Sequence, residues 1–166
     1  MSSKPWVLII MGSDSDAEVM SQAAAALDEA GVPYDFTVAS AHRSPERTKQ
    51  IVTDAEANGA AVFIAGAGMA AHLPGVVASL TTRPVIGVPL ASGALQGLDA
   101  LYAIVQMPPG IPVASVAIGG ARNAGILAAQ IIATADPALA THLKEQRRDM
   151  AAAVTTKSKK VEKSTR

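Results

Sequence analysis

Five short apolar segments recur along the chain at intervals of 24 to 28 residues. Most of them are apolar at nearly every position rather than at every second one, which is typical of strands buried on both faces of a parallel sheet. The segments are WVLIIMG from Trp6, YDFTVAS from Tyr34, AAVFIAG from Ala60, PVIGVPL from Pro84 and PVASVAI from Pro112. The pattern therefore predicts five parallel strands.

Patterns typical of helices fill the intervals between these segments. Gly31 stands where a left-handed stop would end the first helix, and Ser44 and Pro45 begin the second as an N-cap and a first-turn proline. The predicted helices cover residues 17–30 (opening near 14–16), 44–58, 70–80, 95–106 and 121–135. Because a helix follows each strand, we predict an α/β fold, a three-layer (αβα) sandwich with a five-stranded parallel sheet.

An extra C-terminal helix is predicted from Pro137, after the sandwich is complete. Leu139, Leu143 and the run Met150–Val154 make part of it apolar, so we predict that it packs on another subunit; packing on its own domain is the alternative. The chain would then form one domain over 1–156. A basic tail at 157–166, with five basic residues and one acid, is expected to be solvated and flexible.

Composition excludes several classes of function. The 166 residues suit one domain, and 14 basic against 14 acidic side chains leave no net charge to attract nucleic acid or a membrane. The absence of cysteine excludes disulfides and thiol chemistry. No leader pattern precedes Trp6, and no uninterrupted apolar stretch reaches about 18 residues, so a cytoplasmic protein is expected.

Polar side chains gather directly after the predicted strands, at the edge where parallel sheets bind ligands. After the first strand, residues 13–16 offer hydroxyls and carboxylates; one of them caps a helix, and the others could bind a ribose or a phosphate. After the second strand, Arg43 supplies a planar donor fork for phosphate or carboxylate. Its neighbour His42, expected to be neutral beside the positive helix end, could accept and return a proton, with a purely structural role as the alternative.

The loop after the third strand matches the dinucleotide fingerprint G-x-G-x-x-A over residues 66–71 only in part. It follows the wrong strand, Pro74 interrupts the helix, and no acid lies about 20 residues further on. We therefore expect no nucleotide cofactor. The loop is interpreted as a glycine-rich segment whose backbone approaches a substrate, with His72 as a second imidazole. No histidine and acid spacing predicts a metal site, and His142 is expected to be solvated.

Five motifs in order carry a resemblance: MGSDSD, SAHRSP, AGAGMAAHLPG, PVIGVP and GLDALYAIVQMPPGIPVASVAIGGARNAGILAAQI. Over roughly Val7 to Ile132 the chain resembles the bacterial class I N5-carboxyaminoimidazole ribonucleotide mutases of purine biosynthesis, in the AIR carboxylase family. The resemblance implies a flavodoxin-like sandwich, a homo-octamer whose C-terminal helix reaches neighbouring subunits, and no metal or organic cofactor. It implies an isomerase that moves a carboxylate from the exocyclic nitrogen of an imidazole ribonucleotide to ring carbon C4.

The same resemblance implies roles for seven residues. His42 would be the general acid and base. The substrate-binding residues would be Ser13, Asp16 and Arg43 at the ribose phosphate end, Ser40 and the backbone of Gly68 against the substrate, and His72 near the migrating carboxylate.

Two points remain open in the sequence. Met69 stands where the family pattern usually has glycine; it would be costly if the position needs a positive φ and harmless if the side chain points to a subunit interface. We predict the second. The rival functions are a carboxylase that joins free carbon dioxide to aminoimidazole ribonucleotide, and a non-catalytic flavodoxin-like binding module. The SAHRSP and AAHLPG motifs favour the mutase.

Overall fold

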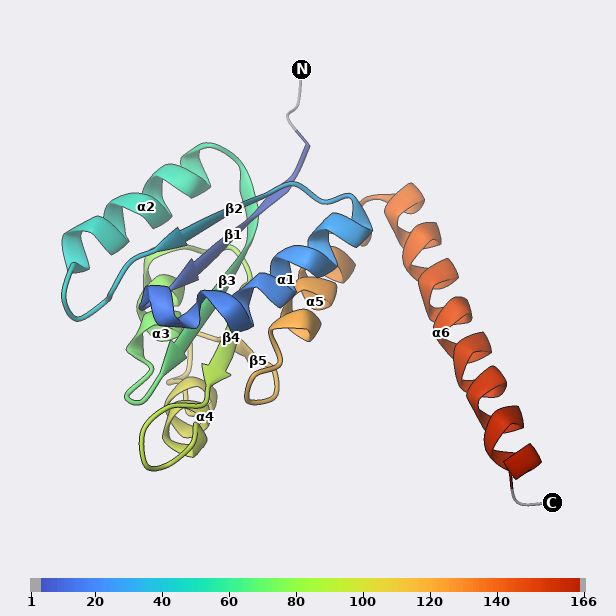
Figure 1. Ribbon diagram of the computed structural model, residues 1–166. Coiled ribbons are helices and arrows are strands. Elements are labelled where there is room, and N and C mark those ends of the chain that lie inside the picture. The colour runs from blue at the N-terminus through green and yellow to red at the C-terminus, as the bar shows by residue number, and fades with distance from the viewer. Residues whose placement is uncertain (1–3, 165–166) are drawn as a thin grey trace.

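The computed structural model describes residues 4–164 and contains the predicted parallel sheet with helices on both faces (Figure 1). The strand order is β2-β1-β3-β4-β5, and every neighbouring pair is parallel. The strands are β1 (Trp6–Met11), β2 (Tyr34–Val38), β3 (Ala60–Gly68), β4 (Val85–Leu90) and β5 (Ala114–Ser115). This order puts the topological switch point between β1 and β3, where open α/β sheets bind ligands.

Two helical layers enclose the sheet and confirm the three-layer sandwich. Helices α1 and α5 share one buried apolar cluster with the sheet, and α2, α3 and α4 share the other. The helical elements are η1 (Asp14–Asp16), α1 (Ala17–Ala30), α2 (Pro45–Ala57), α3 (His72–Leu80), α4 (Leu98–Val105), α5 (Ala121–Ala133) and α6 (Pro137–Ser164).

Strand β1 shows how an uninterrupted apolar run supplies two cores. Val7, Ile9 and Met11 lie in the cluster with α1 and α5, whereas Leu8 and Ile10 lie in the opposite cluster. Successive strand residues point to opposite faces, so a strand covered on both faces needs apolar residues throughout. The expectation of burial on both faces is confirmed for β1 and β4 but is wrong for the edge strand β2, most of which is exposed.

The fifth strand is much shorter than its apolar run, because only Ala114 and Ser115 pair with β4. Beyond them, the Pro89 carbonyl accepts a hydrogen bond from the Gly119 N–H. That carbonyl faces β5, and the missing N–H of the proline would have pointed the same way. The regular ladder therefore ends where β4 has no donor to offer.

The predicted signals for the end of the first helix and the start of the second can be compared with α1 and α2. Pro45 is the first residue of α2, as predicted, and Gly31 ends α1 in the left-handed region with φ 66°. Ser44 is the N-cap residue of α2, also as predicted, but its side chain makes no capping hydrogen bond to the helix. Its hydroxyl instead donates to the Ser40 carbonyl and accepts from the Ser40 N–H, each at 3.1 Å.

Helix α6 leaves the body of the domain after its first turns (Figure 1). Leu139 and Leu143 pack against the cluster of α1 and α5, and His142 Nε2 lies 2.9 Å from the Glu29 carbonyl oxygen rather than being only solvated. The helix continues to Ser164 and so includes most of the basic tail predicted at 157–166. The flexibility of that tail stays a prediction, and its last two residues, 165–166, lie outside the described part.

Candidate active site

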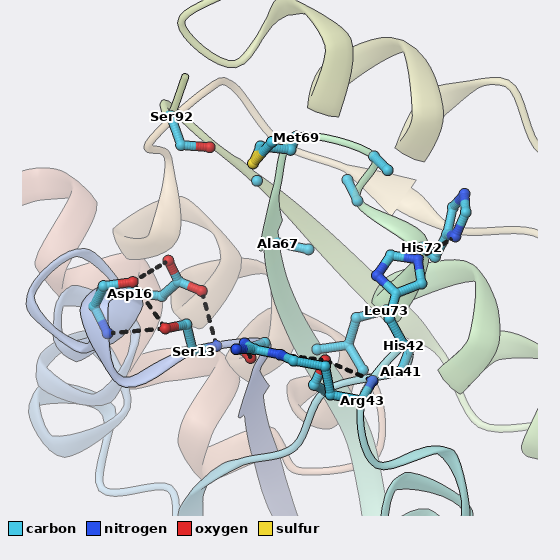
Figure 2. Close-up of a pocket in the computed structure, with 16 residues that line it drawn as sticks. Ser13, Asp16, Ala41, His42, Arg43, Ala67, Met69, His72, Leu73 and Ser92 are labelled. Carbon is cyan, nitrogen blue, oxygen red and sulfur yellow. Dashed lines mark hydrogen bonds between the residues drawn. The ribbon is translucent and has the colours of Figure 1, made fainter.

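A cavity of about 430 Å³ lies at the carboxyl ends of β1, β2 and β3, beside the switch point. All seven residues that the sequence singled out line it. Figure 2 labels Ser13, Asp16, His42, Arg43 and His72 among them, which converge from three loops. The lining comprises Gly12, Ser13, Ser15, Asp16, Ser40, Ala41, His42, Arg43, Ala67, Gly68, Met69, Ala70, Ala71, His72, Leu73 and Ser92.

The loop after β1 is organised by a capping box. The Ser13 hydroxyl accepts from the Ser15 N–H at 3.4 Å, and Asp16 Oδ2 accepts from the Ser13 N–H at 3.2 Å. Burial raises the pKa of the Asp16 carboxyl above its usual value, and the hydrogen bonds from Ser13 and Ser15 act in the opposite direction. The carboxylate keeps further lone pairs for a ligand, so a cap and a binding group are combined in one side chain.

The loop after β2 carries Ser40, His42 and Arg43 on a turn closed by the Ser44 hydroxyl. Ser40 Oγ accepts from the Arg43 N–H at 3.2 Å, and Arg43 Nη2 donates to the Gly12 carbonyl at 3.3 Å. The guanidinium therefore spans the β1 and β2 loops across the pocket (Figure 2). Guanidinium has five N–H donors in a fixed plane, so donors remain for an anion.

The loop after β3 holds two non-glycine residues in the left-handed region, Met69 with φ 54° and Ala71 with φ 42°. The Ala71 N–H donates to the Gly68 carbonyl at 3.0 Å, and Ala71 is buried while Met69 is 61% exposed. Position 69 therefore has the positive φ that is costly for methionine, and an interface role for its exposed side chain stays a prediction. Strained backbone of this kind persists only where its surroundings fix it, and it gathers at functional sites.

The two pocket histidines touch each other. His42 Nε2 lies 2.5 Å from His72 Nδ1, and the rings meet edge to face with centroids 4.5 Å apart. One nitrogen must donate and the other accept, so this contact allows at most one of the two rings to be an imidazolium. Figure 2 shows the other nitrogen of His42 turned toward the interior of the pocket, available to a ligand. The sequence did not predict this contact.

Ser92 also lines the cavity, although the sequence analysis did not select it. It lies just after β4, in the strand-end segment ASGALQG, so the rule that pointed to the other loops also applied to it. Ser92 has no charged neighbour in sequence and starts no helix, which is why no local signal distinguished it.

Residues 4–164 contain neither a candidate metal site nor a membrane-spanning helix. Within this range no three His, Asp or Glu side chains are grouped so that they could hold a metal ion. No helix in the same range combines the length and the apolarity needed to cross a bilayer.

Comparisons with known proteins agree with this geometry. Residues 6–153 match the family described as AIR carboxylase. The chain is 55% identical to the N5-carboxyaminoimidazole ribonucleotide mutase of Pyrococcus horikoshii, across 97% of this chain and 91% of that protein. It is 52% identical to the phosphoribosylaminoimidazole carboxylase of Schizosaccharomyces pombe, across 96% of this chain but 29% of that protein.

The fold has a solved counterpart in a crystal structure of a Treponema denticola PurE2 variant. The two share a TM-score of 0.88 and 29% sequence identity, over 95% of this chain and 98% of the other. With a family match over most of its length and relatives above half identity, the chain belongs to the AIR carboxylase family.

Proposed function

We propose that this protein is an N5-carboxyaminoimidazole ribonucleotide mutase, an isomerase of purine biosynthesis that forms 4-carboxy-5-aminoimidazole ribonucleotide. The name of the P. horikoshii relative supports the activity. The observation that carries it is the His42–His72 pair at one side of a cavity that also holds Ser13, Asp16 and Arg43. Proton-transfer groups and anion-binding groups are thus present in one pocket of ligand size.

His42 is proposed to move the proton in both halves of the reaction. As an imidazolium, its Nε2–H donates to His72 and its Nδ1–H faces the pocket. When the bond from the exocyclic nitrogen to the carboxylate carbon breaks, its electron pair stays on nitrogen, which takes the Nδ1 proton, and carbon dioxide is released. Ring carbon C4 then attacks carbon dioxide, and neutral His42 removes the C4 proton. No proton is gained or lost overall.

The other pocket residues are proposed to hold the two ends of the ribonucleotide. Arg43 binds the phosphate, Asp16 accepts from ribose hydroxyls, and Ser13 and Ser40 add hydrogen bonds. Gly68, which has no side chain, lines the cavity and is proposed to face the substrate with its backbone. His72 holds His42 in place beside the migrating carboxylate. Because both ends of the ribonucleotide are held, the intermediate is kept from rotating before carbon dioxide is recaptured.

Carbon dioxide must not escape between the two steps, yet both histidines are exposed in the single chain. We propose that neighbouring subunits of a homo-octamer close the pocket and that α6 takes part in the assembly. Apolar side chains are exposed beside the pocket and along α4, which suits subunit contacts: Met69, Leu95, Leu98, Tyr102 and Val105. A chain ending at Asp136 should then assemble into fewer subunits, as measured by light scattering, and an unchanged number of subunits would contradict this role of α6. The proposed location is the cytoplasm.

The S. pombe relative gives the carboxylase rival a specific observation in its favour. The two activities differ in their source of carbon dioxide, so turnover at low bicarbonate separates them. The mutase should convert N5-carboxyaminoimidazole ribonucleotide without added bicarbonate. Strict dependence on bicarbonate, with aminoimidazole ribonucleotide as the substrate, would replace the mutase by the carboxylase.

His42→Asn tests the chemistry itself, in the purified enzyme and in a purine-requiring strain that lacks the mutase. We expect the wild type to rescue growth and the variant to lose at least about a hundredfold in rate, the low end for general acid–base catalysis. His142→Asn is the matched control, because His142 is exposed on α6 and does not line the cavity. A fully active His42→Asn enzyme would favour the non-catalytic binding module.

A further inference from the structure

Ser92 carries a buried hydroxyl with no hydrogen-bond partner among the described residues. A buried unsatisfied hydroxyl destabilises the folded protein, so such groups are rare and call for an explanation. Asp99 Oδ1 and Ser115 Oγ, in the described part of the chain, share this property. Neither Asp99 nor Ser115 lines the cavity, whereas Ser92 does.

The Ser92 hydroxyl lies directly against the backbone of Gly68, where β3 and β4 run side by side. A Cβ on Gly68 would overlap the hydroxyl, and it would also lie 3.3 Å from the Leu90 carbonyl oxygen. Only glycine at position 68 leaves room for this serine without a shift. The loop that approaches the substrate by its backbone therefore also brings a hydroxyl to the same wall of the pocket.

The position of Ser92 selects the part of the ligand that it would meet. Figure 2 shows Ser92 and Met69 across the pocket from Arg43, with the Ser92 hydroxyl pointing toward Met69. A phosphate held by Arg43 would therefore lie away from Ser92, and the opposite end of the ligand would face it. One rotation about χ1, between staggered positions, is enough to redirect a serine hydroxyl into the pocket.

We propose that Ser92 is a further substrate-binding residue, whose hydroxyl donates to the carboxylate that migrates between nitrogen and C4. This inference rests on the proposed mutase function. Among residues 4–164 the hydroxyl has no hydrogen-bond partner, and the bound ribonucleotide would supply one. The Ser92 hydroxyl would therefore lower the stability of the ligand-free protein and contribute to ligand binding.

The test combines a stability measurement with steady-state kinetics on the full-length protein. Ser92→Ala removes the unsatisfied hydroxyl, so we expect a higher melting temperature in the absence of ligand. We also expect kcat/KM to fall about tenfold, since a hydrogen bond to a charged group contributes about 1.5 kcal/mol or more. More aminoimidazole ribonucleotide should escape per product formed. Ser92→Cys, which is slightly larger than serine but only a weak donor, should show the same kinetic loss.

Ser115→Ala is the matched control. It removes an equally buried, unpartnered hydroxyl that lies outside the cavity, so its melting temperature should rise while kcat/KM and the escape of intermediate stay at wild-type values. This pair separates a ligand-binding hydroxyl from one that is merely unsatisfied.

Three outcomes would overturn the inference. Wild-type kinetics in Ser92→Ala and Ser92→Cys would remove Ser92 from the site. A lower melting temperature, or a lower mass by light scattering, would assign the serine a structural role. If the wild type itself converts no N5-carboxyaminoimidazole ribonucleotide in the same assay, the proposed function fails first, and the inference falls with it.

Discussion

Two of the three loops that line the candidate site, those after β1 and β3, are held in place by different means. The loop after β1, residues 12–16, is held by hydrogen bonds between its own polar groups, including both halves of the Ser13–Asp16 capping box. The loop after β3, residues 68–72, is held in a strained backbone, with positive φ at Met69 and Ala71. The polar groups of the loop after β1 are hydrogen-bonded within the loop itself, whereas the backbone conformation of the loop after β3 depends on the residues packed around it.

The difference matches the work that we propose for each loop. A loop that holds ribose can be a stable helix start, because the ligand uses only lone pairs that the cap leaves free. A loop that places His72 against His42 must follow one backbone path, and residues with φ above zero cost about 1 to 3 kcal/mol each to hold there. The buried Ala71 side chain and its hydrogen bond to Gly68 provide part of what fixes that path.

His72→Ala removes the histidine contact that the strained loop positions, and it should have the largest effect of the variants in these two loops. His42 then loses its hydrogen-bond partner His72, and we expect kcat to fall about tenfold or more while KM changes little. The pH–rate profile should also change, because the two rings no longer share a hydrogen bond. A rise in KM with unchanged kcat and an unchanged pH profile would instead make His72 a simple binding residue.

Sequence reasoning located this site because its signals are local. Five apolar runs predict the sheet, and the ends of the runs place Ser13, His42 and His72 at one edge. The His42–His72 contact joins residues 30 positions apart on different loops, so only the folded chain shows it. The positive φ of Met69 and the unsatisfied Ser92 hydroxyl are likewise tertiary properties, set by neighbours that no window of sequence contains.

Met69→Gly should relax the strained loop, with a smaller effect. A left-handed backbone costs a non-glycine residue about 1 to 2 kcal/mol, and glycine removes that cost. Glycine also makes the unfolded chain more flexible, which lowers the gain in stability by about 0.5 to 1 kcal/mol. We therefore expect the free energy of unfolding, measured with urea at fixed protein concentration, to rise by up to about 1.5 kcal/mol. Met69→Ala keeps the same φ and should show no gain. An equal gain in both variants would mean that the exposed side chain, rather than the backbone, was the unfavourable element.

Asp16→Asn tests the hydrogen-bonded loop through pH and should have the smallest effect. Burial is the largest influence on the Asp16 carboxyl and raises its pKa above the ordinary value of 3.8. The folded protein then binds this proton more tightly than the unfolded chain does. The contribution of Asp16 to the free energy of unfolding is therefore fully present below pH 3.8 and is lost as the pH rises through the folded-state pKa. Urea unfolding from pH 3 to 7 should show the wild type losing stability relative to Asp16→Asn over that window, whereas a relative gain would mean that the hydrogen bonds from Ser13 and Ser15 outweigh burial.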